Sequence, residues 1–125
     1  MTDNPDTPPL RVQLLREGAQ LTNGARDKEY GPPALNMAAS GELKAVFRKY
    51  LARKISPAEL EAIDMALTKI GRLACGVPKR DTYVDASTYL AIAGEIGLNE
   101  SQASQVAQSA FQKVVFKDDL EELRD

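Results

Sequence analysis

The 125-residue sequence contains no histidine and no tryptophan, and aromatic residues make up only 6% of it. The lack of histidine excludes a catalytic triad with a histidine base, and it excludes a histidine metal site. A single cysteine, Cys75, excludes an intramolecular disulfide and is typical of a reducing cytoplasm. No apolar run approaches the roughly 20 residues of a membrane span, and the polar N-terminus does not resemble a signal peptide. We therefore expect a cytoplasmic protein without membrane contact.

The residues that are present fit one small domain with an aliphatic core. Hydrophobic residues make up 43% of the chain, which is enough for a modest core at this length. The net charge of -2 gives no reason to expect nucleic acid as a partner. Five basic side chains and no acidic one stand between residues 44 and 54, and we interpret this run as a solvated helix face.

Helical periodicity accounts for most of the chain, and no strand pattern is long enough to predict a sheet. Residues 1–9 are polar and rich in proline, so we predict a disordered lead. A helical domain is expected over residues 10–116, followed by an acidic C-terminal tail over 117–125. The predicted fold class is all-α, a single-domain bundle of four or five helices. The helices are expected over residues 10–21, 33–53, 57–75, 81–97 and 100–116.

The start of the third of these helices has the clearest signal. Ser56 has the position of an N-cap, Pro57 takes the first helical position and Glu59 closes a capping box. We interpret this group as purely structural. Gly97 is expected to end the fourth helix, and a fifth helix is expected to begin after Asn99.

The connection "NGARDKEYGPP" at residues 23–33 carries more chemistry than a plain linker needs. Gly31 permits a backbone turn that other residues resist, and the two prolines after it restrict the chain on both sides. Such a loop would hold Arg26, Asp27 and Tyr30 in one geometry at the start of the next helix, where free N–H groups favour an anion.

Polar residues also fall on faces that the helical pattern predicts to be buried. Asp85 lies in the middle of the apolar face of the fourth helix, and Asp81 lies at its edge one turn earlier. A buried carboxylate is costly unless it is paired. We therefore expect Asp85 to be mostly buried and within ion-pair reach of Lys69, Arg72 or Arg26.

Taken singly, these residues have ordinary structural explanations. Asp81 is most simply an N-cap, Asn36 on the apolar face of the second helix could cap a kink near Gly41, and an Asp–Lys pair between helices is usually structural. Their convergence from four segments favours a ligand site, and its cations suit a phosphate. No catalytic residue and no set of metal ligands stands out. The candidate ligand-binding residues are Arg26, Asp27, Tyr30, Asn36, Lys69, Arg72, Asp81 and Asp85.

Three stretches, "RDKEYGPPALN", "KIGRLACG" and "DTYVDASTYLAIAGE", resemble a small helical domain of phages and prophages whose function is unknown. The resemblance covers about residues 21–97. It implies a phage or prophage gene acting in the host cytoplasm, and it implies no activity. At position 88 the chain has threonine where that family often has glycine. The matching pattern is R-D-x-x-Y-G, an asparagine, K-x-x-R and D-x-x-x-D, carried here by Arg26, Asp27, Tyr30, Gly31, Asn36, Lys69, Arg72, Asp81 and Asp85.

A more distant similarity is to the all-helical nucleotide pyrophosphohydrolases of the MazG type. That similarity implies magnesium held by carboxylate pairs on adjacent helices. Glu61 and Asp64 have the right spacing for one pair. The helical wheel, however, points Glu61 away from the core and leaves Asp64 outside the apolar face. Magnesium is therefore expected only if this hydrolase alternative holds, and otherwise we expect no cofactor.

Three functions follow from these patterns. The first is a binder of a phosphate-bearing small molecule, a nucleotide or nucleotide signal, and we favour this non-enzymatic function. The second is a divergent metal-dependent nucleotide pyrophosphohydrolase. The third is an interaction or structural module whose buried polar groups serve the fold. We also expect a homo-oligomer formed through the C-terminal helix, where Ala103, Ala107 and Phe111 belong to an apolar surface.

Overall fold

The computed structural model describes residues 5–122, and within them it contains five α-helices and no strand. The predicted all-α class is therefore confirmed. The ends of the predicted lead and of the predicted tail, residues 1–4 and 123–125, lie outside the described residues. Within residues 5–122 no helix combines the length and the apolarity that a bilayer crossing requires. The helices are α1 (Leu10–Leu21), α2 (Ala25–Tyr30), α3 (Pro33–Tyr50), α4 (Pro57–Cys75) and α5 (Arg80–Glu122).

Local sequence signals set the boundaries of α1 and α4 as predicted. The predicted range of α1 is correct at both ends, and α4 begins at Pro57 after the N-cap Ser56. The Ser56 hydroxyl accepts a hydrogen bond from the Glu59 N–H at 3.2 Å, which is the first half of a capping box. The second half is a wrong prediction, because the Glu59 carboxylate accepts hydrogen bonds from Arg53 instead.

The predicted fourth and fifth helices are one continuous helix, α5, which runs through Gly97 and Asn99. Glycine costs a helix interior only about 1 kcal/mol, so it does not end a helix by itself. The structure gives Gly97 another role. A Cβ at this position would lie 2.8 Å from the carboxyl carbon of Glu59, so the glycine allows α5 to pass close to the start of α4.

The connection at residues 23–33 is also more ordered than a loop. Residues Ala25–Tyr30 form the short helix α2 between Gly24 and Gly31, whose φ angles are 111° and 80°. Both angles lie in the left-handed region, where glycine is favoured. Each glycine therefore turns the chain sharply at one end of α2.

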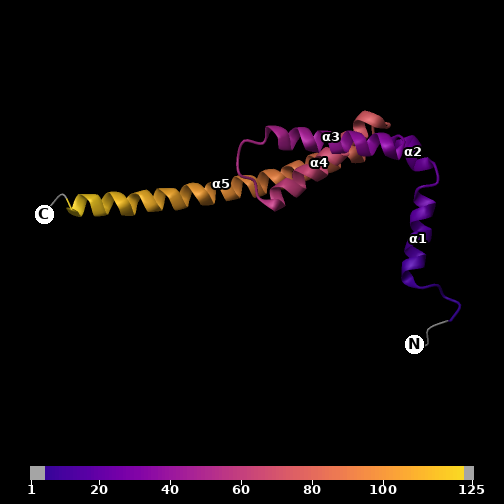
Figure 1. Cartoon of the computed structure of the whole chain (residues 1–125), viewed down its shortest axis with the longest axis horizontal. Helices are drawn as coiled ribbons and strands as arrows, with labels where there is room; N and C mark the ends of the chain where they lie inside the picture. Colours follow the sequence, from indigo (N-terminus) through magenta and orange to yellow (C-terminus); the bar gives the residue numbers. More distant parts are fainter. Residues whose placement is uncertain (1–4, 123–125) are drawn as a thin grey trace.

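Helix α4 is the middle element of the body, with α3 and α5 packed against it and α2 resting on the α3–α4 end (Figure 1). Helix α1 points away from the other helices at one end of the molecule, and the second half of α5 extends beyond them at the opposite end (Figure 1). The body is therefore an open arrangement of helices with two projecting elements.

Small side chains make up the core. Among the described residues the buried apolar side chains are Ala62, Ala66 and Ala93, and no large side chain is fully buried. Helices α3 and α4 approach closely at Gly71, where a Cβ would lie 3.2 Å from the Ser40 nitrogen. The Ser40 hydroxyl is 3.3 Å from the Thr68 hydroxyl across the same contact. Packing through small residues brings the backbones together but buries little apolar surface.

Helix α2 is fastened to the end of α4 by its backbone. The Val77 N–H donates to the Glu29 carbonyl at 2.9 Å. A Cβ at Gly76 would collide with that same Glu29 carbonyl oxygen, and a Cβ at Gly31 would lie 2.6 Å from the Cys75 carbonyl oxygen. Glycine at both positions is therefore a condition of this contact, and the contact fixes where the side chains of α2 lie.

We predict that Gly76→Ala lowers the free energy of unfolding by about 1–3 kcal/mol, because the added methyl forces two backbones apart. Chemical denaturation measures this change. Gly41→Ala is the matched control, since no atom lies within 4 Å of a Cβ added to Gly41. The control should stabilise helix α3 by roughly 0.5–1 kcal/mol. Equal stability of Gly76→Ala and the wild type would contradict the close contact.

Candidate functional site

The aromatic ring of Tyr30, at the C-terminal end of α2, is surrounded by positive charge. The Arg72 guanidinium carbon lies 4.7 Å from the ring centroid, the Arg26 guanidinium carbon 5.4 Å and the Lys79 ammonium 5.5 Å. All three distances are within the roughly 6 Å range of a cation–π interaction. One ring thus gathers cations from α2, from α4 and from the connection before α5.

Lys79 is a member of this cluster that the sequence did not reveal. Its ammonium lies 3.1 Å from the Glu29 carboxylate, and the hydrogen bond to Glu29 raises the pKa of Lys79. Glu29 stands in the charged connection at residues 23–33, whereas Lys79 stands in a short connection that had drawn no interpretation. Only the docking of α2 on the end of α4 brings the two together.

Beside Tyr30 there is a pocket of about 280 Å³ between α2, the start of α3 and α4. Five of the eight predicted site residues line it. The Asn36 side-chain amide donates a hydrogen bond to the Gly31 carbonyl at 3.3 Å, which holds the start of α3 against the end of α2. The predicted residues in the lining are Arg26, Asp27, Tyr30, Asn36 and Arg72, and they are joined by Thr22, Gly31, Pro33 and Met37.

The other three predicted residues, Lys69, Asp81 and Asp85, do not line this pocket. The Lys69 ammonium lies 3.2 Å from the Asp85 carboxylate, so the predicted ion pair between α4 and α5 is confirmed. The predicted burial of Asp85 is wrong, because 48% of its side chain is exposed. Helix α5 packs on α4 along one side only, and its other flanks stay open to solvent.

Asp81 does not act as the N-cap that its position suggested. Helix α5 begins at Arg80, so Asp81 lies inside the first turn and is exposed. A carboxylate there still interacts favourably with the positive end of the helix dipole. Asp81 and Asp85 therefore have structural explanations that are separate from the pocket at Tyr30.

One member of the carboxylate pair that a magnesium-dependent hydrolase would need, Asp64, is already engaged by an arginine. Arg48 on α3 donates to both oxygens of Asp64 on α4, at 3.0 and 2.7 Å, and this hydrogen bonding raises the pKa of Arg48. Glu61 is exposed. Over residues 5–122 no group of three or more acidic, cysteine or histidine side chains is arranged to hold a metal ion.

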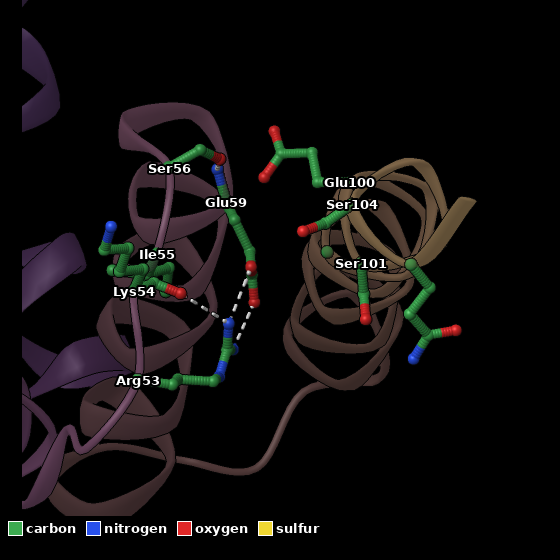
Figure 2. A pocket seen from close by; sticks show the side chains of 10 residues that line it. Arg53, Lys54, Ile55, Ser56, Glu59, Glu100, Ser101 and Ser104 are labelled. Atoms are coloured by element: carbon green, nitrogen blue, oxygen red, sulfur yellow. Dashed lines mark hydrogen bonds and ion pairs between the residues drawn. The ribbon is translucent and has the colours of Figure 1, made fainter. Parts of the chain in front are cut away.

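A second hollow, of about 540 Å³, lies between the α3–α4 connection and α5. Figure 2 shows Arg53 reaching from that connection to the Glu59 carboxylate, with Glu100, Ser101 and Ser104 on the facing helix. The two Arg53–Glu59 hydrogen bonds measure 3.1 and 2.5 Å. These bonds tie the connection to the start of α4.

Glu59 is the most buried charged residue in the described chain, with 5% of its surface exposed. Hydrogen bonding from Arg53 lowers the pKa of Glu59, and this effect outweighs the opposite effect of burial. Nothing in the sequence pointed to this role, because Ser56, Pro57 and Glu59 were interpreted as a capping box. Arg53 was part of the basic run interpreted as a solvated face.

We predict that acid destabilises the protein partly through Glu59. The pKa of this carboxyl is lower in the folded chain than its ordinary value of 4.5, so the unfolded chain binds the proton more readily. The stabilisation is complete above pH 4.5 and is lost as the pH falls through the folded-state pKa. Melting temperatures measured from pH 7 to pH 3 should fall less steeply for Glu59→Gln than for the wild type. Glu42→Gln, at an exposed site, should keep the wild-type slope.

Comparison with known proteins places the chain in a family. The family model described as Domain of unknown function (DUF6378) matches residues 13–97, which is more than half of the chain. This range includes the Tyr30 pocket and the Lys69–Asp85 pair. Searches of the curated proteins and of the solved structures found no match. The chain therefore belongs to the DUF6378 family.

Proposed function

We propose that the protein binds a phosphate-bearing small molecule, a nucleotide or nucleotide signal, in the pocket beside Tyr30. The observation that supports this proposal is that the guanidinium groups of Arg26 and Arg72 both lie close to the ring of Tyr30. Within residues 5–122 neither Arg26 nor Arg72 forms an ion pair with a carboxylate. A guanidinium that stacks through its face keeps its N–H donors available in the plane of the group, and those donors match phosphate oxygens.

In this proposal Tyr30 orients the arginines and does not stack a nucleobase. Three cations already lie within 5.5 Å of its ring centroid, which leaves little of the ring surface for another flat group. The pocket is also at the small end of the range of ligand pockets, which starts at roughly 300 Å³. We therefore expect the phosphate to enter the pocket and the rest of the ligand to extend along its rim.

The two alternatives have less support. For the pyrophosphohydrolase, the bidentate contact of Arg48 occupies the oxygens of Asp64, and the pocket beside Tyr30 carries arginines where carboxylates would be needed. The structural-module alternative is supported by the backbone contact between α2 and α4, because this contact accounts for Gly31 and Gly76 without a ligand. That contact does not explain the two unpaired arginines.

The biological setting is part of the same proposal. The resemblance of residues 21–97 to a phage and prophage domain supports a role in the cytoplasm of a host cell, where nucleotides are abundant. We propose binding without catalysis and without a resident cofactor. A second copy of the chain is the protein partner that we propose, through the C-terminal part of α5.

We predict that Arg26→Ala and Arg72→Ala each weaken nucleotide binding on the order of tenfold or more, because each removes a charge-assisted hydrogen bond worth about 1.5–3 kcal/mol. Isothermal titration calorimetry with nucleoside diphosphates and triphosphates, cyclic dinucleotides and ADP-ribose, each with and without magnesium, measures this change. Folding is checked by circular dichroism.

Two variants serve as controls for this experiment. Lys28→Ala removes a cation from α2 that does not line the pocket. Lys69→Met keeps an aliphatic stem but removes the charge paired with Asp85. Both should leave the affinity unchanged. If a nucleotide binds the wild type and both arginine variants equally well, the Tyr30 pocket is not its site. Binding that needs magnesium and releases pyrophosphate would favour the hydrolase.

A further inference from the structure

Two parts of the chain carry apolar side chains that nothing in the protomer covers. Helix α1 has no buried residue, and Leu10, Leu14 and Leu21 are each more than half exposed. The second part is the segment of α5 after Glu100, residues 101–122, which we call the overhang. All of its side chains described, over 101–114, are exposed, including Phe111 at 69%.

The surface area of the protomer is larger than that of a compact monomer of the same mass. It exposes 10,068 Å², whereas a compact monomer of this mass exposes about 6,600 Å². The excess of about 3,500 Å² on one protomer exceeds the share of roughly 1,000–2,500 Å² that each partner buries in an obligate homodimer. The protomer therefore has enough spare surface for a large interface.

The exposed stripe of the overhang continues the face of α5 that packs on α4. Tyr89, Ala93 and Ile96 are the more buried residues on that face. At 100° per residue the same line passes on to Ala107, Phe111 and Val114. This face of α5 packs on α4 along the length of α4. Beyond the first residues of α4, none of the described residues covers it. A second helix is the element that fits it.

The distribution of charged residues also favours a contact between helices at these stripes. Residues 101–112 contain no charged side chain, so covering them removes no ion from water. On α1, Leu10, Leu14 and Leu21 fall within 40° on the helical wheel. Both arginines of α1 lie outside that stripe, and Glu17 lies at its edge. An isolated helix of 12 residues is only marginally stable in water, so α1 needs such a partner.

We propose that the leucine stripe of α1 packs on the overhang of a second copy of the chain, and that a two-fold axis repeats the contact. This proposal rests on the self-association proposed above. Helix α1 and the overhang lie at opposite ends of one protomer and cannot meet within it (Figure 1). Two antiparallel protomers bring each α1 beside the other's overhang.

The first test is the mass in solution by sedimentation equilibrium of the full chain. The wild type should have twice the 13.6 kDa protomer mass. Phe111→Glu and Leu14→Glu should each raise the dissociation constant on the order of a hundredfold, because each places a charge in the contact. The controls Gln112→Glu and Gln20→Glu add the same charge away from the stripes and should remain dimeric. Circular dichroism should show the same helix content in the controls and the wild type.

The second test identifies which helices meet. In a Cys75→Ser background, copies carrying Leu14→Cys are mixed with copies carrying a cysteine at position 103, 107 or 111, and the mixture is oxidised. Disulfides require Cα atoms about 4.4–6.8 Å apart, so at least one mixture should yield a heterodisulfide between α1 and the overhang. This test does not depend on the folding of the glutamate variants.

The outcomes separate the two proposals. A monomeric wild type would overturn both self-association and the pairing of α1 with the overhang. A dimer that forms only overhang-to-overhang or only α1-to-α1 disulfides would overturn the pairing alone. A dimer whose mass is unaffected by Phe111→Glu and Leu14→Glu would also overturn it, because another surface would then hold the copies together.

Discussion

The other helices of the body approach helix α4 closely, and this close approach is the main constraint on the fold. At Gly71, Gly76 and Gly97 an added methyl would press on Ser40 of α3, on the backbone of α2 and on Glu59, respectively. Each glycine thus lets a different neighbour reach the backbone of α4 or its first turn. Because these contacts rely on small groups, the bundle is held by shape and by hydrogen bonds more than by large buried side chains.

Salt bridges complete each of these junctions. Arg48–Asp64 joins α3 to α4, Arg53–Glu59 joins the connection to α4, Lys69–Asp85 joins α4 to α5, and Lys79–Glu29 joins α2 to the connection before α5. In each pair at least one partner is a third or more exposed. Pairs that water reaches contribute about 0–1 kcal/mol each, so they select the register of the helices more than they stabilise the fold. Two cations of the basic run at 44–54 thus serve this purpose, although the run was interpreted as solvated.

The same constraint connects the fold with the proposed functions. Docking α2 by its backbone places Tyr30 where cations from three elements converge, and so it builds a pocket at one end of the molecule. Packing through small residues leaves the large aliphatic side chains outside, and so it leaves surface for a second copy. The proposed partner contact at α1 would then lie at the same end of the protomer as the pocket, and the contact at the overhang at the opposite end.

The all-α class and the limits of α1 and α4 could be predicted from the sequence, because caps and helical periodicity are local. Five of the eight predicted site residues also line one pocket, since Arg26, Asp27, Tyr30 and Asn36 are close in sequence and needed only Arg72 from elsewhere. Three features could not be predicted: Lys79 joins Tyr30, Asp85 is half exposed and α5 continues through Gly97. These features depend on which helix lies over which, and periodicity along one helix carries no information about its neighbours.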